Sequence, residues 1–391
     1  MRRPRDDLAR IEDFLSVQRP QVRRPAEGAL RRPFVDPAAA YRGQLWDWDA
    51  YFTLIALRPH LPDGGLVRDC VMNFLDHQRA DGSIPFVIPT DLAQSPPGRA
   101  ADSPLNSAKP VLAQMALLAG DQVRDWAAQA VPGLRRHVEH WERTQRHPSG
   151  LFVWRSHRGS GADNHPGVYG RPLNATIGID LNCLMVAEYR ALARLHDLAG
   201  DQRCGADCAL RADGLAELVR RDLWDPVARD FCHADALTRT PAGVRQEADW
   251  AVPLRYRSWV GFYALWAGVA TTGQAAAMVA ACDLFCDFGI RTLSPREPLY
   301  NLAATANPSN WQGPVWVVAN YIAFAGLRGY GFAVPARRIL DGTLALLAGD
   351  LERTGTLHEY YDPDTGEGIT GAGFLNWNLL ATTMHQMGDS P

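Results

Sequence analysis

The stretch Gly355–Gly368 reads GTLHEYYDPDTGEG and separates two runs whose apolar residues recur at helical spacing. Its Asp-Pro and Thr-Gly pairs predict a tight turn shortly after Glu359. Glu359 is flanked by aromatic rings, where loss of solvent can shift a carboxyl pKa and where a sugar ring can stack. The stretch therefore predicts an ordered loop that presents one carboxylate. A surface turn with a helix-capping acid is the alternative interpretation.

A second carboxylate, Asp163, lies far upstream in a similar setting. Its segment, RGSGADNHP, runs from Arg158 to Pro166 and is also bracketed by glycines. Two isolated carboxylates in ordered loops are typical of a general acid and a general base.

The rest of the chain predicts helices, with hardly any alternating stretch that would indicate a strand. No internal repeat marks a solenoid. The expected helices lie roughly at 6–17, 48–59, 65–79, 106–119, 123–145, 177–199, 203–222, 257–269, 274–289, 314–329, 335–352 and 372–387.

Every second connection between these helices carries unusual residues. In an up-and-down array, alternate connections lie at the same end, so six such loops would gather on one face. We therefore predict an all-α chain folded as an (α/α)6 toroid of six helical hairpins, with the active site at one end. It forms a single catalytic domain over 1–391, in which 1–30 is an N-terminal extension with a helix. The six loops are WDWD at 46–49, NSAKP at 106–110, the Asp163 loop, YRSW at 256–259, NWQGPVW at 310–316 and the Glu359 loop.

Composition excludes several classes of partner. A net charge of -3 and a pI near 6.4 give no basic surface for nucleic acid or an anionic membrane. Charged residues and a proline at the N-terminus, without an apolar run behind them, predict no secretory signal and hence a cytoplasmic protein. The seven cysteines predict free thiols; the Cys204/Cys208 spacing has no histidine pair beside it, so no metal is expected there. The sequence leaves open whether the chain forms a homo-oligomer.

The six loops supply candidate ligands for a sugar. Tryptophan and tyrosine rings can carry the apolar faces of a sugar, although core packing is their commoner role. Polar side chains in the same loops can bond to hydroxyl groups, although Asp49 and Asn106 are equally good helix caps. Trp377, in the middle of an expected helix, is interpreted as core. The predicted substrate-binding residues, besides Lys109, are Arg42, Trp48, Asp49, Asn164, Trp259, Trp311, Gln312, Trp316 and Tyr360.

Lys109 is the only lysine among the forty basic residues of the chain. It lies near the N-terminus of an expected helix, where the helix dipole disfavours a cation. Its partner is either a carboxylate of the substrate or a nearby aspartate. The sequence favours the salt bridge slightly.

Four segments together resemble a clan of inverting glycosidases that holds glycoside hydrolase family 63 and the family 37 trehalases. They are YRGQLWDWDAYF from Tyr41 to Phe52, SGADN from Ser160 to Asn164 with IDLN from Ile179, NWQGPVW from Asn310 to Trp316, and HEYYDPDTG from His358 to Gly366. The short chain and Gln312 look most like bacterial mannosylglycerate and glucosylglycerate hydrolases. Ala162 and Lys109 depart from the usual pattern.

The resemblance implies hydrolysis with inversion of a small α-linked glucoside or mannoside, without metal or organic cofactor. Asp163 would protonate the leaving oxygen and Glu359 would activate a water, with the carboxyl groups about 6.5–9.5 Å apart. A trehalase-type disaccharide hydrolase is the alternative within the clan. Two alternatives lie outside the clan. One is a helical-toroid sugar epimerase, which would use His165, His233 or His358, and the other is a sugar-binding protein without catalytic activity.

Overall fold

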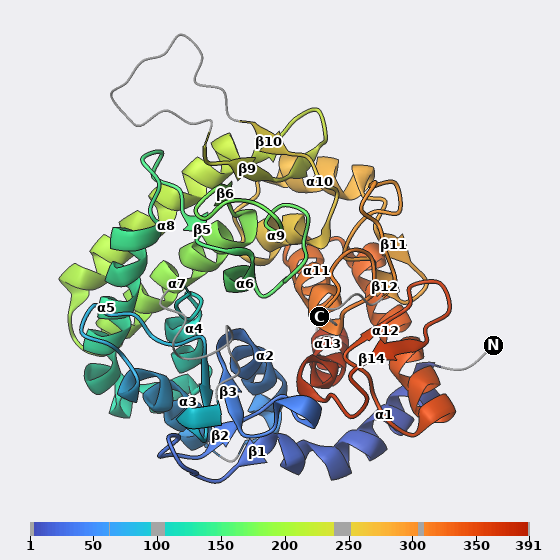
Figure 1. Ribbon diagram of the computed structural model, residues 1–391, viewed down its shortest axis with the longest axis horizontal. Helices are drawn as coiled ribbons and strands as arrows, with labels where there is room; N and C mark the ends of the chain where they lie inside the picture. The colour runs from blue at the N-terminus through green and yellow to red at the C-terminus, as the bar shows by residue number, and fades with distance from the viewer. Residues whose placement is uncertain (1–3, 62, 95–105, 238–251, 304–308, 390–391) are drawn as a thin grey trace.

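Two concentric rings of helices form the molecule (Figure 1). The computed structural model describes residues 4–61, 63–94, 106–237, 252–303 and 309–389. Each helix of the inner ring contacts the next, and the last contacts the first, so the ring closes. The inner helices are α2 (Asp47–Leu57), α4 (Leu112–Leu117), α7 (Ile179–Leu198), α9 (Tyr263–Trp266), α11 (Val317–Gly329) and α13 (Leu380–Asp389).

The outer ring covers the inner one and faces solvent. Inner helices such as α7 and α11 are buried along most of their length, whereas outer helices such as α8 are buried on one side only. This contrast is expected when one helical layer packs between the core and a second layer. The outer helices are α1 (Pro4–Gln18), α3 (Gly65–Asp76), α5 (Ala127–Gln145), α8 (Gln202–Asp222), α10 (Thr272–Ala281) and α12 (Ala333–Thr354).

Local signals set several helix ends. The Asp201 carboxylate accepts from the Cys204 amide and caps α8, and Thr271 forms a reciprocal capping box with Gln274 at the start of α10. Helix α12 ends at Gly355, whose φ of 70° is left-handed. Helix α1 packs against α12, which places the start of the described chain in the outer ring; residues 1–3 of the expected extension lie outside the described part.

Short strand pairs decorate the connections, and the sequence did not reveal them. Each strand has two or three residues, too few for an alternating pattern to be visible. The strands are β1 (Arg23–Arg24), β2 (Phe34–Val35), β3 (Gln44–Trp46), β4 (Val87–Pro89), β5 (Val153–Trp154), β6 (Thr176–Ile177), β7 (Trp224–Asp225), β8 (Asp230–Phe231), β9 (His233–Asp235), β10 (Pro253–Leu254), β11 (Phe285–Cys286), β12 (Gly289–Ile290), β13 (Tyr360–Tyr361) and β14 (Gly368–Thr370).

Two of these pairings hold the loops that carry the predicted acid and base. Strands β5 and β6 are antiparallel, with Val153 opposite Ile177, and belong to a sheet of order β10-β9-β6-β5. The chain between them, which contains α6 (His157–Ser160), carries Asp163. Strands β13 and β14 form a hairpin directly after Glu359, with Tyr360 opposite Thr370.

The toroid is confirmed, with four helices much shorter than expected. The fourth begins only after Pro110, at Leu112, and the eighth is a 3-10 turn, Trp259–Phe262, followed by one turn of α9. The ninth ends at Ala281, because the apolar residues that follow form the β11–β12 hairpin. The twelfth begins only at Leu380, after the 3-10 turn Asn376–Leu379. Among the described residues, no helix has the length and apolarity to cross a membrane.

The remaining 3-10 turns are connectors. They are Arg19–Val22, Ala39–Tyr41, Arg58–His60, Leu92–Gln94, Gly120–Asp125 and Asn376–Leu379.

Candidate active site

A cavity of about 320 Å³ lies among the predicted loops. Five of the six loops contribute side chains to it, while the loop at 256–259 does not reach it. Both predicted carboxylates, Asp163 and Glu359, line this one cavity although they are far apart in sequence. The full lining is Tyr41, Trp46, Trp48, Asp49, Phe86, Lys109, Arg158, Gly161, Asp163, Ser309, Trp311, Trp316, Glu359 and Trp377.

Glu359 is held from three sides. Its amide donates to the Thr370 carbonyl at 2.9 Å, which fixes the backbone against β14. The Tyr41 hydroxyl donates to Oε1 of the carboxylate at 3.1 Å. Gly371 has a φ of 73°, and a Cβ there would lie 2.5 Å from the Glu359 Cβ and 3.0 Å from Oε2. The hairpin can therefore pass this close behind the carboxylate only because residue 371 is glycine.

The Asp163 loop approaches the cavity wall equally closely. Gly161 has a φ of 79°, and a Cβ there would lie 2.8 Å from the Trp48 ring and 3.2 Å from the Lys109 Cε. His157, which precedes the carboxylate on the same loop, has a pKa lowered by burial and partly restored by the Asp163 charge. The loop is thus packed directly onto the side chains that line the cavity.

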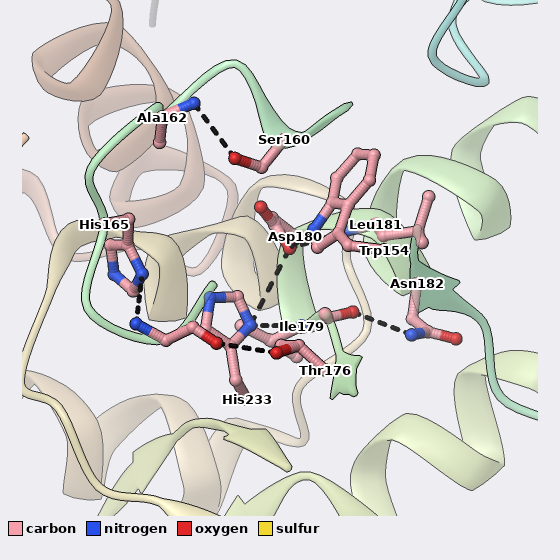
Figure 2. A network of polar contacts seen from close by, with 12 residues as sticks. Trp154, Ser160, Ala162, His165, Thr176, Ile179, Asp180, Leu181, Asn182 and His233 are labelled. Carbon is pink, nitrogen blue, oxygen red and sulfur yellow. Dashed lines mark hydrogen bonds and ion pairs between the residues drawn. The ribbon is translucent and has the colours of Figure 1, made fainter. Parts of the chain in front are cut away.

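A polar network anchors the end of the Asp163 loop (Figure 2). The Nδ1 atom of His165 accepts from the Gly167 amide at 3.1 Å, and its Nε2 lies 2.8 Å from the Ser258 hydroxyl. Thr176 on β6 donates to the Gly167 carbonyl at 2.7 Å, which ties the loop to the sheet. Burial, with the neighbouring His233, lowers the pKa of His165 to about 3. His165 is therefore a neutral structural group at ordinary pH.

The start of α7 completes this network (Figure 2). Asp180 accepts from the Trp154 indole at 2.9 Å and from the Leu181 amide at 2.8 Å, and the Ile179 amide donates to His233 at 3.0 Å. These bonds join β5, α7 and β9 around the base of the loop. The base of the loop that carries Asp163 is thus surrounded by bonded residues from three different elements.

Four aromatic rings form a continuous stack beside the carboxylates. Neighbouring centroids from Trp259 through Trp311 and Trp316 to Tyr360 are 5.2, 3.9 and 4.7 Å apart, and each pair is close to parallel. Only the two middle rings line the cavity. Trp259 and Tyr360, both predicted as ligands, instead support the stack from its ends. Trp377, interpreted as core from the sequence, is buried and also lines the cavity.

Lys109 forms a buried ion pair below the cavity. Its Nζ lies 3.3 Å from Asp47 Oδ1, and its amide donates to Oδ2 of the same carboxylate at 2.7 Å. The ammonium also lies 4.9 Å from the centroid of the Trp48 ring. The aspartate partner that the sequence analysis considered is thus present, while Lys109 still lines the cavity.

Asp49 lines the cavity on the same side. It accepts from the Asn376 amide, so it does not cap α2, which begins two residues earlier. Burial raises the pKa of Asp49 well above its usual value; the nearby Asp47 charge adds to the shift, and Lys109 opposes it. Asn106, the other expected cap, accepts from Ser156 at 3.0 Å instead, because its helix begins later.

The other predicted polar ligands build the loop framework. Asn164 donates to Asn310 at 2.9 Å and accepts from the Trp311 amide, while Gln312 donates to the Asn164 carbonyl at 2.9 Å. Arg42 is exposed and donates to Gln21 at 3.2 Å. None of these three predicted ligands lines the cavity.

Sequence reasoning did not select several residues that do line it. Tyr41 could have been found, because it begins the first of the four family-like segments. Phe86 follows no motif and is brought in by the pairing of β3 with β4. Arg158 and Ser309 lie at the edges of motifs whose central residues attracted attention.

Comparison with known proteins shows the family to which the chain belongs. The family model described as a mannosylglycerate hydrolase MGH1-like glycoside hydrolase domain matches residues 42–377. A mannosylglycerate hydrolase of Thermus thermophilus is 31% identical over 159 residues, which are 40% of this chain and 33% of that enzyme. Mannosylglycerate hydrolase MGH1 of Selaginella moellendorffii is 32% identical over 120 residues, 30% of this chain and 22% of its own length.

Solved structures share the fold over most of the chain. A family 63 mannosylglycerate hydrolase from Thermus thermophilus, in complex with glucose, has a TM-score of 0.69 at 22% identity and covers 97% of this chain and 99% of its own. Neutral trehalase from Saccharomyces cerevisiae has a TM-score of 0.66 at 18% identity, covering 92% of this chain and 74% of its own. Because the family model spans most of the sequence, including both carboxylate loops, this chain belongs to the mannosylglycerate hydrolase MGH1-like family of glycoside hydrolases.

Proposed function

We propose that the protein hydrolyses a small α-linked glucoside or mannoside with inversion of the anomeric configuration. The observation that carries the proposal is the shared cavity, which both Asp163 and Glu359 line together with stacked tryptophans. Family membership supports a glycosidase, and the two relatives compared by sequence above are mannosylglycerate hydrolases.

In this mechanism Asp163 gives its proton to the glycosidic oxygen as the bond to the anomeric carbon breaks. Glu359 takes a proton from a water that attacks the opposite face of the sugar. The Tyr41 hydroxyl donates a hydrogen bond to Glu359, and such a bond favours the ionised form that acts as a base. The Trp311 and Trp316 rings offer an apolar wall for the sugar.

The preferred substrate class is a glycoside with an acidic aglycone, such as mannosylglycerate or glucosylglycerate. Two cationic side chains, Lys109 and Arg158, line the cavity that would receive it. Arg158 lies at the exposed edge of the cavity, and a guanidinium can form two parallel hydrogen bonds with a carboxylate. A neutral disaccharide, as in a trehalase-type reaction, remains the second candidate because the trehalase fold matches as well.

The histidines argue against an epimerase. His165 bonds to Ser258 and to the Gly167 amide, and the His358 ring lies 2.8 Å from the buried Asp350. Neither histidine lines the cavity, and the same is true of His233. A histidine of this set could transfer a proton on a bound sugar only after leaving its present partners.

The test is a substrate panel with two variants. Purified protein is incubated with mannosylglycerate, glucosylglycerate, trehalose, kojibiose, nigerose and aryl α-glucosides, and free sugar is measured. Asp163→Asn and Glu359→Gln should each lower turnover by about 10²–10⁴-fold with unchanged circular dichroism. Full activity in either variant would show that the carboxylate is wrongly assigned.

The stereochemistry is tested separately on the best substrate. Proton NMR early in the reaction should detect the sugar anomer opposite in configuration to the substrate. First appearance of the retained anomer would exclude direct attack by water.

A further inference from the structure

The turn that joins α7 to α8 gathers three metal-binding side chains on the outer side of the rings. His196 lies in the last turn of α7, Asp201 caps α8, and Cys204 lies in the first turn of α8. One ring nitrogen, one carboxylate oxygen and the thiol sulfur all lie within 4.8 Å of one another. We propose that these three residues bind a zinc ion, at a site separate from the sugar-binding cavity.

The histidine provides the independent reason for a ligand. His196 is 2% exposed, yet among the described residues its ring nitrogens have no well-formed hydrogen bond, and the contact of Nδ1 with Asp201 is a long one. The nearest carboxylate oxygen, Asp201 Oδ2, lies 3.4 Å from Nδ1, too far for a strong hydrogen bond. Buried polar atoms rarely stay without a partner, because each costs about 1–3 kcal/mol. An ion between the two residues would satisfy Nδ1.

The separation of His196 and Asp201 suits zinc, and the thiol sulfur lies within 4.8 Å of both. Zinc binds nitrogen and oxygen at about 2.0–2.2 Å and sulfur at about 2.3 Å, so tetrahedral ligands lie roughly 3.3–3.8 Å apart. The His196–Asp201 separation of 3.4 Å falls in that range. Asp201 uses Oδ1 to cap the helix, which leaves Oδ2 for the ion. A set of nitrogen, carboxylate and thiolate donors favours zinc over magnesium or calcium. A water molecule would be the fourth ligand.

Of the nearby cationic groups, Arg135 interacts with the Cys204 thiol and would have to move aside for an ion. Two arginines line the adjoining cavity, and both already have acidic partners. Arg135 pairs with Glu139 at 3.1 Å, and Arg211 pairs with Glu142 and with Asp207, each at 2.7 Å.

The thiol must lose its proton when the ion binds. The hydrogen bond and the negative charge of Asp201 raise the pKa of Cys204 in the metal-free protein. Zinc reverses this effect, because a coordinated thiol is deprotonated. The thiol proton passes to solvent, and a sulfur–zinc bond forms. Inspection of the sequence did not reveal this site, because the histidine comes from the preceding helix.

Cobalt is the probe, since it occupies zinc sites and reports thiolate ligation by its absorption. Titration of chelator-treated full-length protein with Co²⁺ should produce a thiolate charge-transfer band and tetrahedral d–d bands that saturate at one ion per chain, and Zn²⁺ should then remove them. Cys204→Ser should abolish the charge-transfer band, and His196→Gln should weaken binding by at least about 100-fold.

Cys208→Ser is the matched control, because Cys208 lines the same outer cavity but is not one of the three ligands. It should bind cobalt as the unmodified protein does. Circular dichroism of the metal-free variants checks that each is folded. Zn²⁺ should raise the melting temperature of the unmodified protein and of Cys208→Ser, but not that of Cys204→Ser or His196→Gln. No cobalt spectrum, or a charge-transfer band that survives Cys204→Ser, would overturn the proposal.

Discussion

Replacing Tyr41 with Phe would remove one oxygen atom and leave the aromatic ring in place. That oxygen donates a hydrogen bond to Glu359 Oε1 at 3.1 Å. The ring packs edge-to-face on Trp46 and on Phe374, contacts that Phe can keep. The substitution therefore tests a single polar contact to the proposed general base.

The expected size follows from the geometry. A hydrogen bond to a charged group is worth about 1.5–3 kcal/mol, and a long bond from a half-buried tyrosine belongs at the lower end. Because about 1.4 kcal/mol corresponds to one pKa unit, the pKa of Glu359 should rise by about one unit in the variant. The hydroxyl stabilises the ionised form, so its loss moves the acidic limb of the kcat/KM profile to higher pH. The alkaline limb should stay in place.

The assay is kcat/KM against pH on the best substrate of the panel. Tyr330→Phe is the control, because the Tyr330 hydroxyl bonds to the Ala270 carbonyl at 2.5 Å and the residue does not line the cavity. An acidic limb that does not move in Tyr41→Phe, or moves equally in Tyr330→Phe, would refute the role of this hydrogen bond.

Lys109→Met should destabilise the fold by about 3–5 kcal/mol in urea unfolding, because it leaves Asp47 buried without its partner, and the double variant with Asp47→Leu should recover most of the loss. Equal loss of activity on neutral and acidic glycosides would accompany this structural role, whereas selective loss on acidic ones would indicate contact with substrate. Gly371→Ala should lower kcat by about 10–100-fold with little change in KM, since the new methyl group displaces Glu359; an unchanged kcat would contradict the close approach. His165 has a folded-state pKa of about 3, so the unfolded chain binds more protons between about pH 3 and 6.5 and stability falls on acidification through that range. His165→Asn should reduce the difference in unfolding free energy between pH 7 and 4.5 by about 2 kcal/mol, and an unaltered difference would show that another group controls acid unfolding.

The helical periodicity and the alternating loop chemistry were sufficient to predict the toroid, because both depend on local spacing. Glu359 and Asp163 could be selected for the same reason, as isolated carboxylates between glycines. Arrangements that depend on long-range packing could not be predicted. Trp259 and Trp311 look alike in sequence, and only the stacking order places one in the cavity and the other behind it.

Polar residues show the same limit more sharply. Asn164 and Gln312 carry the side chains expected of sugar ligands, yet they bond to one another's loops. A side chain that can bond to a sugar hydroxyl group can equally bond to a backbone amide. The sequence does not show which of these two partners lies near the side chain in the folded protein. The contact of Lys109 was an exception, because the sequence analysis gave a nearby aspartate as one of its two possible partners, the other being a substrate carboxylate.

Closure of the inner ring depends on bonds between α2 and the segment that precedes α13. Asn376 bonds to both Asp49 and Thr53, which are more than three hundred residues away in the chain. During synthesis on the ribosome, Asp49 and Thr53 on α2 can form their hydrogen bonds to Asn376 only after the last hairpin has left the exit tunnel. The cavity cannot form piece by piece as the chain lengthens. Nascent chains arrested before Asn376 should therefore be inactive, however much of the ring they already contain.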